Sequence, residues 1–444
     1  MQLSSLLGHV QELLGNIRAS SKPADSLMDA FFRSHKYLGS HDRRFIAETT
    51  YGTLRHLRRC EFIVQSAIGT NSENVTREDG LLLLPIAYLA AIERRPLTAA
   101  DVSSELSSMA LKKGMVTFLK TLSDGLPIPQ NDVAEQIGIE YSYPDWMVRR
   151  LLYEYGHGET EKICKSLNEP APLTLRVNLL KTTVEQCQGE LKKQEIESTR
   201  TATSPCGLQI TKRINVFSLK SFQDGYFEVQ DEGSQILPLL IDPKPTAKVL
   251  DACAGAGGKT LGFAAIMKNR GEIFATDNNG YRLKELKKRS RRASAFNIRA
   301  LEVATVGDLP DKFKDYFDVV FVDAPCSGLG TIRRNPGMKW TVTEDTVKEV
   351  SEKQSEILRQ CAPLVKPGGR LVYATCTLLK QENEDIVTRF VEANPNFGFV
   401  NPEQMLAKIG LEQANLGDFI KLLPHIHGTD GFFCAVMERI SKTP

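Results

Sequence analysis

Two short segments place a cysteine where it could take part in covalent chemistry. One is the turn Asp323-Ala-Pro-Cys326-Ser-Gly, and the other is Ala-Thr-Cys376-Thr. A lone cysteine is more often a buried packing residue than a nucleophile. Each of these, however, follows an apolar run that predicts a β-strand, Phe317 to Val322 and Arg370 to Ala374 respectively. Ligands of open α/β sheets bind at the carboxyl ends of the strands, so we expect both thiols to lie in one site.

A glycine-rich segment, Asp251 to Thr260, lies between another apolar strand and a helix. Its glycines allow a ligand to approach the backbone, and the start of the helix offers free N–H groups. A phosphate-binding P-loop would need glycine where the chain has Cys253, and a dinucleotide G-x-G-x-x-G motif would need it at Thr260. An acid, Asp277, closes the next predicted strand, where it could bind the ribose hydroxyls of an adenosyl group. The segment therefore predicts binding of S-adenosylmethionine, which carries no phosphate.

Two thiols beside a methyl donor indicate methylation of a pyrimidine carbon. Carbon 5 of the ring is not nucleophilic, but a thiolate that adds to carbon 6 turns carbon 5 into an enamine that attacks the methyl group. Asp323 is the candidate acid that keeps the ring N3 protonated, and the second cysteine could assist the loss of the carbon 5 proton. Methylation of an amine needs none of these groups and favours an Asn/Asp-Pro-Pro-aromatic turn, which the sequence lacks.

The segments described above all lie within residues 241–444, where the sequence has an alternating pattern. Strands alternate there with helices of ten or more residues, which predicts a mainly parallel α/β sheet with helices on both faces. Residues 141–240 read as a strand at 173–178, a helix at 184–196 and a strand at 225–230. This middle block therefore predicts a small α+β subdomain.

Residues 1–140 carry apolar residues at intervals of three and four, which predicts an all-helical block. Its basic residues gather in one part, namely Arg33, His35, Lys36, Arg43, Arg44, Arg55, His56, Arg58 and Arg59. A second basic segment, Arg282 to Arg292, has seven Lys/Arg residues against one acid, Glu285. Each cluster is either a solvated helix face or a surface that contacts RNA phosphates, and the sequence leaves both interpretations open.

The composition is that of an ordinary globular protein of two or three domains, with 444 residues, 41% hydrophobic, 25% charged and a formal net charge of +2. The longest apolar stretch, Leu81 to Ile92, is shorter than the roughly 20 residues that span a membrane. Nine cysteines without a C-x-x-C pair predict neither a disulfide framework nor a metal site. Together with an amphipathic N-terminus that lacks signal-peptide features, they predict a cytoplasmic protein.

In their order along the chain, these motifs resemble the Sun/RsmB (Fmu) family of RNA cytosine-5 methyltransferases. The matching stretches are 175–178, 229–231, 251–260, Asp277 with Arg282-Leu283, 323–328, 333–336, 366–369, 374–377 and 429–433. The resemblance implies a NusB-like helical RNA-binding domain at 1–140, an RRM-like subdomain at 141–240 and a Rossmann-like catalytic domain at 241–444.

The resemblance also implies roles for individual residues. Cys376 would be the nucleophile and Cys326 would assist product release, whereas DNA cytosine methyltransferases use the cysteine of the Pro-Cys turn, so chemistry alone does not choose between the two. The implied cofactor site consists of Cys253, Ala254, Gly255, Ala256, Gly257, Gly258, Lys259, Asp277, Arg282, Asp308 and Asp323. Arg333 and Arg334 follow a catalytic turn and are the candidate RNA contacts.

The substrate implied by the resemblance is a cytosine of bacterial 16S ribosomal RNA, unpaired or flipped out, acted on by a monomer. One departure concerns the cofactor loop, where Gly255-Ala256 replaces the family's usual Ala-Pro, and a more flexible loop is expected. Two other classes stay open, a non-catalytic RNA-binding protein and a methyltransferase for a different acceptor. Transfer of a labelled methyl group would distinguish an enzyme from a non-catalytic RNA-binding protein. Mass analysis of digested RNA would show which base accepts the methyl group.

Overall fold

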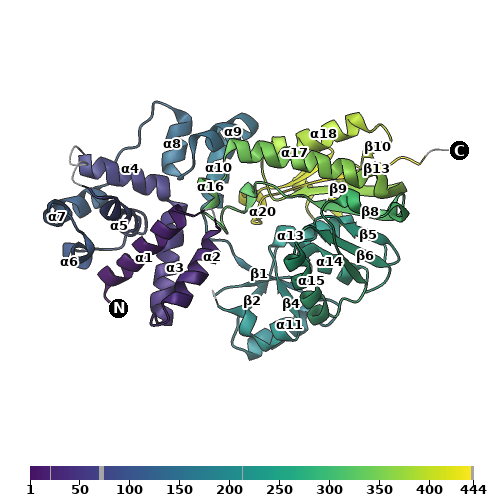
Figure 1. Cartoon of the computed structure of the whole chain (residues 1–444), viewed down its shortest axis with the longest axis horizontal. Coiled ribbons are helices and arrows are strands. Elements are labelled where there is room, and N and C mark those ends of the chain that lie inside the picture. The colour runs from purple at the N-terminus through teal and green to yellow at the C-terminus, as the bar shows by residue number, and fades with distance from the viewer. Residues whose placement is uncertain (21, 70–74, 213, 442–444) are drawn as a thin grey trace. The chain divides into compact units, whose positions relative to one another are not determined.

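The computed structural model describes residues 1–20, 22–69, 75–212 and 214–441, which fold into two compact units. One unit combines Met1–Glu169 with the distant segment Ile332–Val342. The other combines Pro170–Thr331 with the described chain from Thr343 onward. Figure 1 shows the elements of both units in chain order.

The first unit is helical throughout its described residues, as the apolar spacing predicts. Its helices are α1 (Leu3–Arg18), α2 (Ala24–Ser34), α3 (Ser40–Arg55), α4 (Leu57–Ile68), α5 (Arg77–Ala87), α6 (Ala99–Val102), α7 (Met109–Asp124), α8 (Val133–Glu140), α9 (Asp145–Tyr155), α10 (His157–Leu167) and α16 (Met338–Thr341). Leu7 of α1 is fully buried against Leu82 and Leu83 of α5. The expected boundary near residue 140 falls inside this compact unit, because α9 and α10 pack with it.

Lys339 of α16 fixes the segment Ile332–Val342 within the helical unit. Its side chain is completely buried, and its ammonium donates to the carbonyl oxygens of Arg55 and Ser142 at 3.0 Å and to Oδ1 of Asn168 at 2.5 Å. The same ammonium lies 3.7 Å from the centre of the Tyr143 ring. Burial lowers the pKa of Lys339 well below its usual range, and these contacts give the buried amino group the polar partners that it needs.

The α+β subdomain opens the second unit with a four-stranded antiparallel sheet in the order β2-β3-β1-β4. Its elements are β1 (Leu173–Val177), α11 (Val184–Lys193), β2 (Ser198–Arg200), β3 (Gly207–Ile210), α12 (Lys220–Gln223) and β4 (Phe227–Val229). The predicted strands at β1 and β4 and the predicted helix at α11 are confirmed. Sequence reasoning missed β2 and β3, because they are only three and four residues long and β2 is polar.

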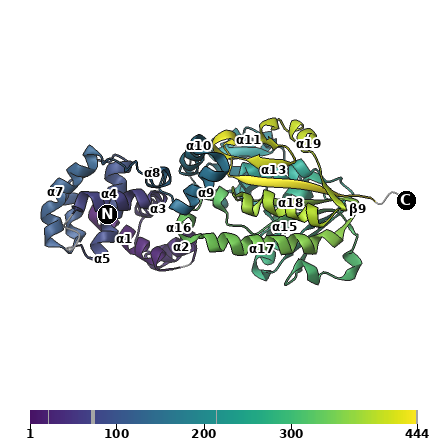
Figure 2. The same cartoon turned by 90° about the horizontal axis from the view of Figure 1, so that it is seen from above.

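The second unit continues with a nine-stranded sheet in the described chain, along which the order is β11-β12-β13-β9-β8-β5-β6-β7, with β10 beside β13. Its elements are α13 (Glu232–Ile241), β5 (Lys248–Asp251), α14 (Gly258–Ile266), β6 (Glu272–Asp277), α15 (Gly280–Ala293), β7 (Ile298–Glu302), β8 (Phe317–Asp323), α17 (Glu344–Cys361), β9 (Val365–Thr375), α18 (Glu384–Ala393), β10 (Phe397–Phe399), α19 (Glu403–Ala407), β11 (Asn415–Leu416), β12 (Phe419–Leu422), α20 (Pro424–His427) and β13 (Phe432–Arg439). Figure 2 shows α17 and α18 lying along the sheet.

Helices cover both faces of this sheet, as predicted, but the sheet is mixed rather than mainly parallel. One apolar core joins α13 and α14 to the sheet, and a second joins α17 and α18 to its other side. Strands β5 to β9 pair in parallel, whereas β10 to β13 add antiparallel pairs at one side. The short connections from β11 to β12 and from β12 to β13 favour antiparallel pairing of these strands, since a parallel pair needs a crossover of a dozen or more residues.

Replacing Lys339 by Met keeps the length of the side chain but removes the donors for three buried oxygen atoms. We expect the free energy of unfolding to fall by about 1–3 kcal/mol, the cost of leaving buried acceptors unpaired. Thermal unfolding followed by circular dichroism measures the change. Lys120→Met, at an exposed position of α7, is the matched control and should melt like the wild type. Equal melting temperatures for the two variants would contradict the structural role of Lys339.

Candidate active site and cofactor site

The two cysteine turns meet because their strands are neighbours. Strands β8 and β9 pair in parallel with Asp323 opposite Ala374, so the turns that follow leave the sheet side by side. The sulfur atoms of Cys326 and Cys376 lie 3.4 Å apart, and both thiols are free and partly exposed. This separation far exceeds the roughly 2.05 Å of a disulfide bond. The expectation that both thiols lie in one site is thus met.

Glu382, which sequence reasoning missed, ties the two cysteine turns together. Its buried carboxylate accepts hydrogen bonds from the backbone N–H of Ser327 at 2.7 Å, the Ser327 hydroxyl at 2.6 Å and the Thr377 hydroxyl at 2.9 Å. The backbone N–H of Gly330 also donates to the Cys376 carbonyl oxygen at 2.9 Å. Burial raises the pKa of Glu382, although its hydrogen bonds oppose that shift. The only sequence signal was an acid shortly after the second cysteine turn.

Lys259 and Asp323 form an ion pair beside the thiols. The Lys259 ammonium donates to Oδ2 of Asp323 at 2.6 Å, and the lysine side chain is only 12% exposed. Burial alone would lower the pKa of Lys259, but the charge and hydrogen bond of Asp323 outweigh burial, and the pKa is raised. The lysine therefore stays charged inside the site and points inward from the glycine loop.

The two thiols have different electrostatic surroundings. A hydrogen bond with Cys376 and burial raise the pKa of Cys326 well above its usual range, and the nearby Glu382 carboxylate adds to this shift. Cys376 instead interacts with the positive charge of Lys259. Because burial and negative neighbours destabilise a thiolate, Cys326 is held as a neutral thiol.

The glycine loop turns sharply between β5 and α14. Gly255 and Gly257 adopt positive φ angles of 53° and 83°, a region that favours glycine. The backbone N–H of Gly255 donates to Oδ2 of Asp277 at 2.8 Å, and the N–H of Asn279 donates to Oδ1 of the same carboxylate at 2.8 Å. Asp277 thus anchors the loop from the end of β6, and each of its oxygens keeps a second lone pair that can accept a ligand hydroxyl.

Asp251 lies buried beneath this loop at the end of β5. Its Oδ2 accepts a hydrogen bond from the Thr260 hydroxyl at 2.6 Å, which ties the strand to the first turn of α14. Burial raises the pKa of Asp251 to about 7, against the opposing effect of the Thr260 hydrogen bond. Asp251 therefore supports the loop from below.

Two members of the implied cofactor site lie in exposed positions. Asp308 accepts hydrogen bonds from the backbone N–H and hydroxyl of Thr305 at 2.8 and 3.0 Å, so its carboxylate caps its own 3-10 turn. Arg282 is exposed on the first turn of α15. The structure thus brings together the loop 253–259, Asp277 and Asp323, and leaves Asp308 and Arg282 facing solvent.

The candidate RNA-binding residues are divided between surface and interior. Arg333 is buried, whereas Arg334 is exposed. In the N-terminal cluster, Arg58 pairs with Asp145 at 2.6 Å and Arg59 donates to the Glu140 carbonyl oxygen at 3.1 Å. Burial lowers the pKa of His56 to about 3. The second half of that cluster therefore holds the helical unit together.

Comparison with known proteins defines the family. A model of the 16S rRNA methyltransferase RsmB/F family matches residues 238–438, and a model of the ferredoxin-like domain of RsmF/B-like methyltransferases matches residues 143–217. The probable ribosomal RNA small subunit methyltransferase B of Bacillus subtilis is 30% identical, over 99% of this chain and 100% of its own. This chain belongs to the RsmB/F family. The corresponding Synechocystis protein is also 30% identical to this RsmB/F family member, over 96% of this chain and 98% of its own.

Solved structures share the fold of this RsmB/F family member. The crystal structure of PH0851 superposes with a TM-score of 0.77 at 29% identity and covers 98% of both chains. A methyltransferase homologue from Pyrococcus horikoshii gives a TM-score of 0.59 at 26% identity, over 70% of this chain and 100% of its own. Among the described residues, no helix is long and apolar enough to cross a membrane, and no group of three or more His, Cys, Asp or Glu residues could hold a metal ion.

As an RsmB/F methyltransferase, the protein uses S-adenosylmethionine, and its glycine loop fits that donor. A Cβ atom built on Gly255 would meet no atom within 4 Å, so space is open beside the loop. The carboxylate of Asp277 at the end of β6 and the start of α14 at Gly258 offer acceptor and donor groups to an adenosyl ligand.

Asp277→Ala should weaken binding of S-adenosylmethionine by about 1.5–3 kcal/mol, because it removes hydrogen bonds from the ribose to a charged group. Isothermal titration calorimetry of the full chain without RNA measures the dissociation constant. Asp311→Ala, at an exposed acid of the 3-10 turn Asp311–Phe313 between β7 and β8, serves as the control and should bind the donor normally. An unchanged dissociation constant for Asp277→Ala would refute the placement of Asp277 at the ribose. The same measurement on Asp308→Ala tests whether the exposed Asp308 belongs to the cofactor site.

Proposed function

We propose that this protein methylates carbon 5 of a cytosine in 16S ribosomal RNA, with Cys376 forming a covalent bond to carbon 6. The observation that carries the proposal is the pair of free thiols 3.4 Å apart beside the Lys259–Asp323 ion pair. A methyltransferase for an amine or a hydroxyl has no use for two cysteines at this place. We further propose that it acts in the cytoplasm as a monomer on an unpaired or flipped-out cytosine.

The residues of the site supply each step of this reaction. The Cys376 thiolate forms a bond to carbon 6, the electron pair of the carbon 5–carbon 6 double bond shifts to form a carbon 4–carbon 5 double bond, and N3 takes up a proton from solvent. The Asp323 carboxylate accepts a hydrogen bond from that N3–H and so stabilises the adduct. S-adenosylmethionine, when bound, supplies an electrophilic methyl group. Solvent water at the site then takes the carbon 5 proton, and the electron pair of that C–H bond re-forms the carbon 5–carbon 6 double bond. The carbon 6–sulfur bond breaks, its electron pair returns to Cys376 as the thiolate, and N3 gives its proton back to solvent.

The surroundings of the thiols support this division of roles. The raised pKa of Lys259 keeps a positive charge in the site, paired with Asp323. The raised pKa of Cys326 keeps it a neutral thiol that does not compete for carbon 6. Its sulfur lies 3.4 Å from that of Cys376, where the neutral thiol can hydrogen-bond the water molecule that takes the carbon 5 proton. The contact between the two sulfur atoms thus supports a reaction that uses both thiols, and the order of their roles follows the family resemblance.

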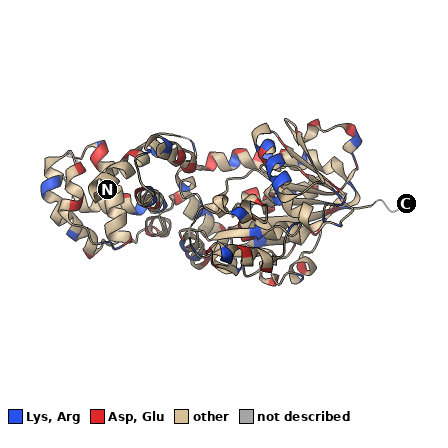
Figure 3. Ribbon diagram, turned by 90° about the horizontal axis from the view of Figure 1, so that it is seen from below, with Lys and Arg blue, Asp and Glu red and all other residues tan. Residues whose placement is uncertain are grey.

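RNA binding is assigned to exposed cations of the helical unit. Basic and acidic residues are interspersed over the ribbon, in keeping with a net charge of only +2, so affinity must come from local patches (Figure 3). Arg33, Lys36 and Arg44 are exposed around α2 and the start of α3. Tyr37 is 68% exposed between them, and its hydroxyl bonds His9 at 2.8 Å. Exposed aromatic rings among cations are typical of single-stranded RNA contacts.

Bisulfite sequencing of ribosomal RNA from cells with and without the protein tests the proposed function directly. One cytosine of 16S RNA should resist conversion only when the protein is present. Mass analysis of the digested RNA should identify the product as 5-methylcytidine. A methylated base of another kind would refute the cytosine assignment while leaving the methyltransferase family intact.

The cysteine roles predict opposite phenotypes for two substitutions. Cys376→Ala should lose activity by several orders of magnitude and form no covalent complex, because the nucleophile is gone. Cys326→Ala should still form the adduct but fail to resolve it, so protein–RNA conjugates should accumulate on a denaturing gel. Cys361→Ala, at a buried thiol of α17, controls for loss of a cysteine as such. Conjugates in the Cys376 variant instead would mean that the roles are exchanged.

The double substitution Arg33→Glu with Lys36→Glu should weaken binding of unmodified 16S RNA. Two lost phosphate contacts should reduce the slope of log affinity against log salt by roughly 1–2. Filter binding across a salt series measures both quantities. The matched control, Lys113→Glu with Lys120→Glu on α7, makes the same change of charge at another exposed place. If both pairs weaken binding equally, the surface around α2 has no special role.

A further inference from the structure

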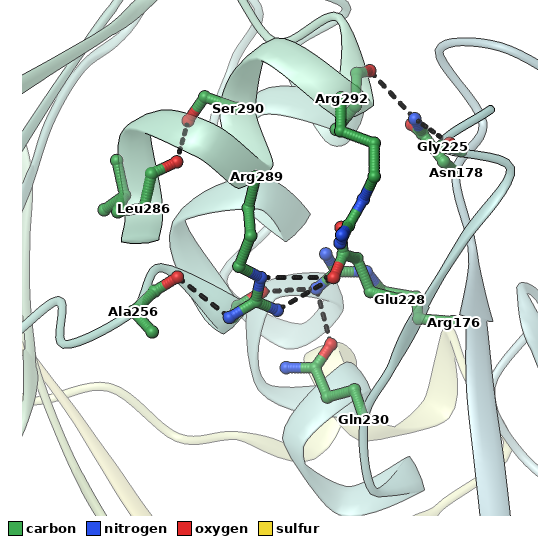
Figure 4. Close-up of polar contacts among 12 residues, drawn as sticks. Arg176, Asn178, Gly225, Glu228, Gln230, Ala256, Leu286, Arg289, Ser290 and Arg292 are labelled. Atoms are coloured by element: carbon green, nitrogen blue, oxygen red, sulfur yellow. Dashed lines mark hydrogen bonds and ion pairs between the residues drawn. The ribbon is translucent and has the colours of Figure 1, made fainter. Parts of the chain in front are cut away.

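The α+β subdomain contacts the cofactor loop directly through one buried arginine. Arg176 of β1 is 6% exposed, and its Nη1 donates to the carbonyl oxygen of Gly258 at 2.6 Å and to Oε1 of Gln230 at 2.5 Å (Figure 4). Gly258 is the first residue of α14 and follows the loop that carries the cofactor groups. A Cβ at Gly262, one turn later, would lie 3.0 Å from the same Nη1, so the absence of a side chain there lets the guanidinium approach.

A second connection runs through helix α15. Glu228 of β4 is 4% exposed and forms ion pairs with Arg289 at 3.0 Å and with Arg292 at 2.5 Å. Nη1 of Arg289 donates in turn to the carbonyl oxygen of Ala256 at 2.8 Å. Figure 4 shows these guanidinium groups converging on Glu228, with Arg289 reaching on to Ala256. Two consecutive parts of the loop are therefore held from the subdomain.

The subdomain also fixes the carboxyl end of α15. Nδ2 of Asn178 donates to the carbonyl oxygens of Gly225 at 2.9 Å and Ala293 at 2.8 Å, which satisfies a carbonyl that the helix leaves free. Gly225 lies so close that a Cβ atom there would be 2.0 Å from the Arg292 carbonyl oxygen. Helix α15 thus cannot shift without disturbing the subdomain, and its Arg289 is presented to the loop at a fixed position.

The strength of these contacts follows from their burial. Burial lowers the pKa of Arg176 to about 10, so the guanidinium remains charged at neutral pH. Hydrogen bonds from a charged donor in a water-poor setting are about twice as strong as neutral ones. Glu228 has two cationic partners, and removing its charge would leave both arginines without their counter-ion. A loop with Gly255-Ala256 in place of Ala-Pro has particular need of such anchors.

We propose that the α+β subdomain is part of the cofactor-binding apparatus, with Arg176 and the Glu228–Arg289 pair as positioning residues for the loop 253–259. They hold the carbonyl oxygens of Gly258 and Ala256, and thereby aim the neighbouring N–H groups and Lys259 at the methyl donor. The role rests on the proposed cofactor site. It extends the function of the subdomain, which the sequence resemblance describes only as RRM-like.

The decisive variant is Glu228→Gln, which keeps the shape of the side chain and does not itself touch the loop. Calorimetry on the full chain without RNA should give a dissociation constant for S-adenosylmethionine that is roughly five- to tenfold higher than in the wild type. The Michaelis constant for the donor should rise in parallel, while kcat at saturating donor and the Michaelis constant for RNA stay within about twofold. Glu185→Gln, at the exposed Glu185–Arg200 pair of the same subdomain, is the matched control and should change nothing.

Hydrogen exchange separates positioning from general destabilisation. In folded Glu228→Gln, amides of residues 253–259 should exchange faster while those of β8 and β9 keep wild-type protection. Arg176→Lys, which retains charge but loses the reach of the guanidinium, should show the same pattern. If either variant does not fold, the wild type serves instead, because binding of the donor should increase protection of residues 174–177 and 227–229.

Asp277→Ala, measured beside these variants, distinguishes the two possible failures. If Asp277→Ala weakens donor binding but Glu228→Gln and Arg176→Lys bind normally, the positioning role is refuted and the cofactor site stands. If Asp277→Ala binds normally as well, the cofactor site itself is wrong. If the variants do not fold, hydrogen exchange of the wild type decides. The proposal is then overturned if donor binding leaves the protection of β1 and β4 unchanged.

Discussion

The site depends above all on the parallel pairing of β8 with β9. Because Asp323 lies opposite Ala374 in that ladder, the two turns that follow bring Cys326 and Cys376 to a sulfur–sulfur distance of 3.4 Å. The buried Glu382 carboxylate then accepts from both turns and fixes their relative position. The Lys259–Asp323 ion pair, with the ammonium 2.6 Å from the carboxylate oxygen, supplies the buried charge of the same site. The sheet and the Glu382 carboxylate thus account for the proximity of two thiols that the proposed reaction uses in sequence.

The cofactor loop is fixed by residues that lie far apart in the sequence. Asp277 of β6, Arg289 of α15 and Arg176 of the subdomain each bind a different backbone group of the segment 255–258. The expected flexibility of Gly255-Ala256 is therefore countered by side-chain anchors rather than by proline. In the helical unit, Lys339 likewise fixes a segment contributed from the catalytic part of the sequence.

Much of this could be predicted from sequence where a residue's role is local. Apolar strands followed by chemistry-bearing turns located β5, β8 and β9, and parallel topology then placed their ends together. The antiparallel strand β13 was missed because strand direction follows from connections that propensity does not reveal. Glu382 and Lys339 were missed, and Arg176 was noted only as part of the motif 175–178, because each acts through burial and distant partners, which no local pattern encodes. Asp308, by contrast, was included in the predicted cofactor site, and in the structure its carboxylate caps its own turn.

The central claim is that Cys376, not Cys326, forms the covalent bond to the base. The most direct measurement uses 16S RNA in which 5-fluorocytidine replaces cytidine, because fluorine at carbon 5 cannot be lost as a proton and the adduct is trapped. Mass spectrometry of the digested wild-type complex should then find the nucleotide on the peptide that contains Cys376. A nucleotide on the Cys326 peptide, or no adduct on either cysteine, would contradict the account.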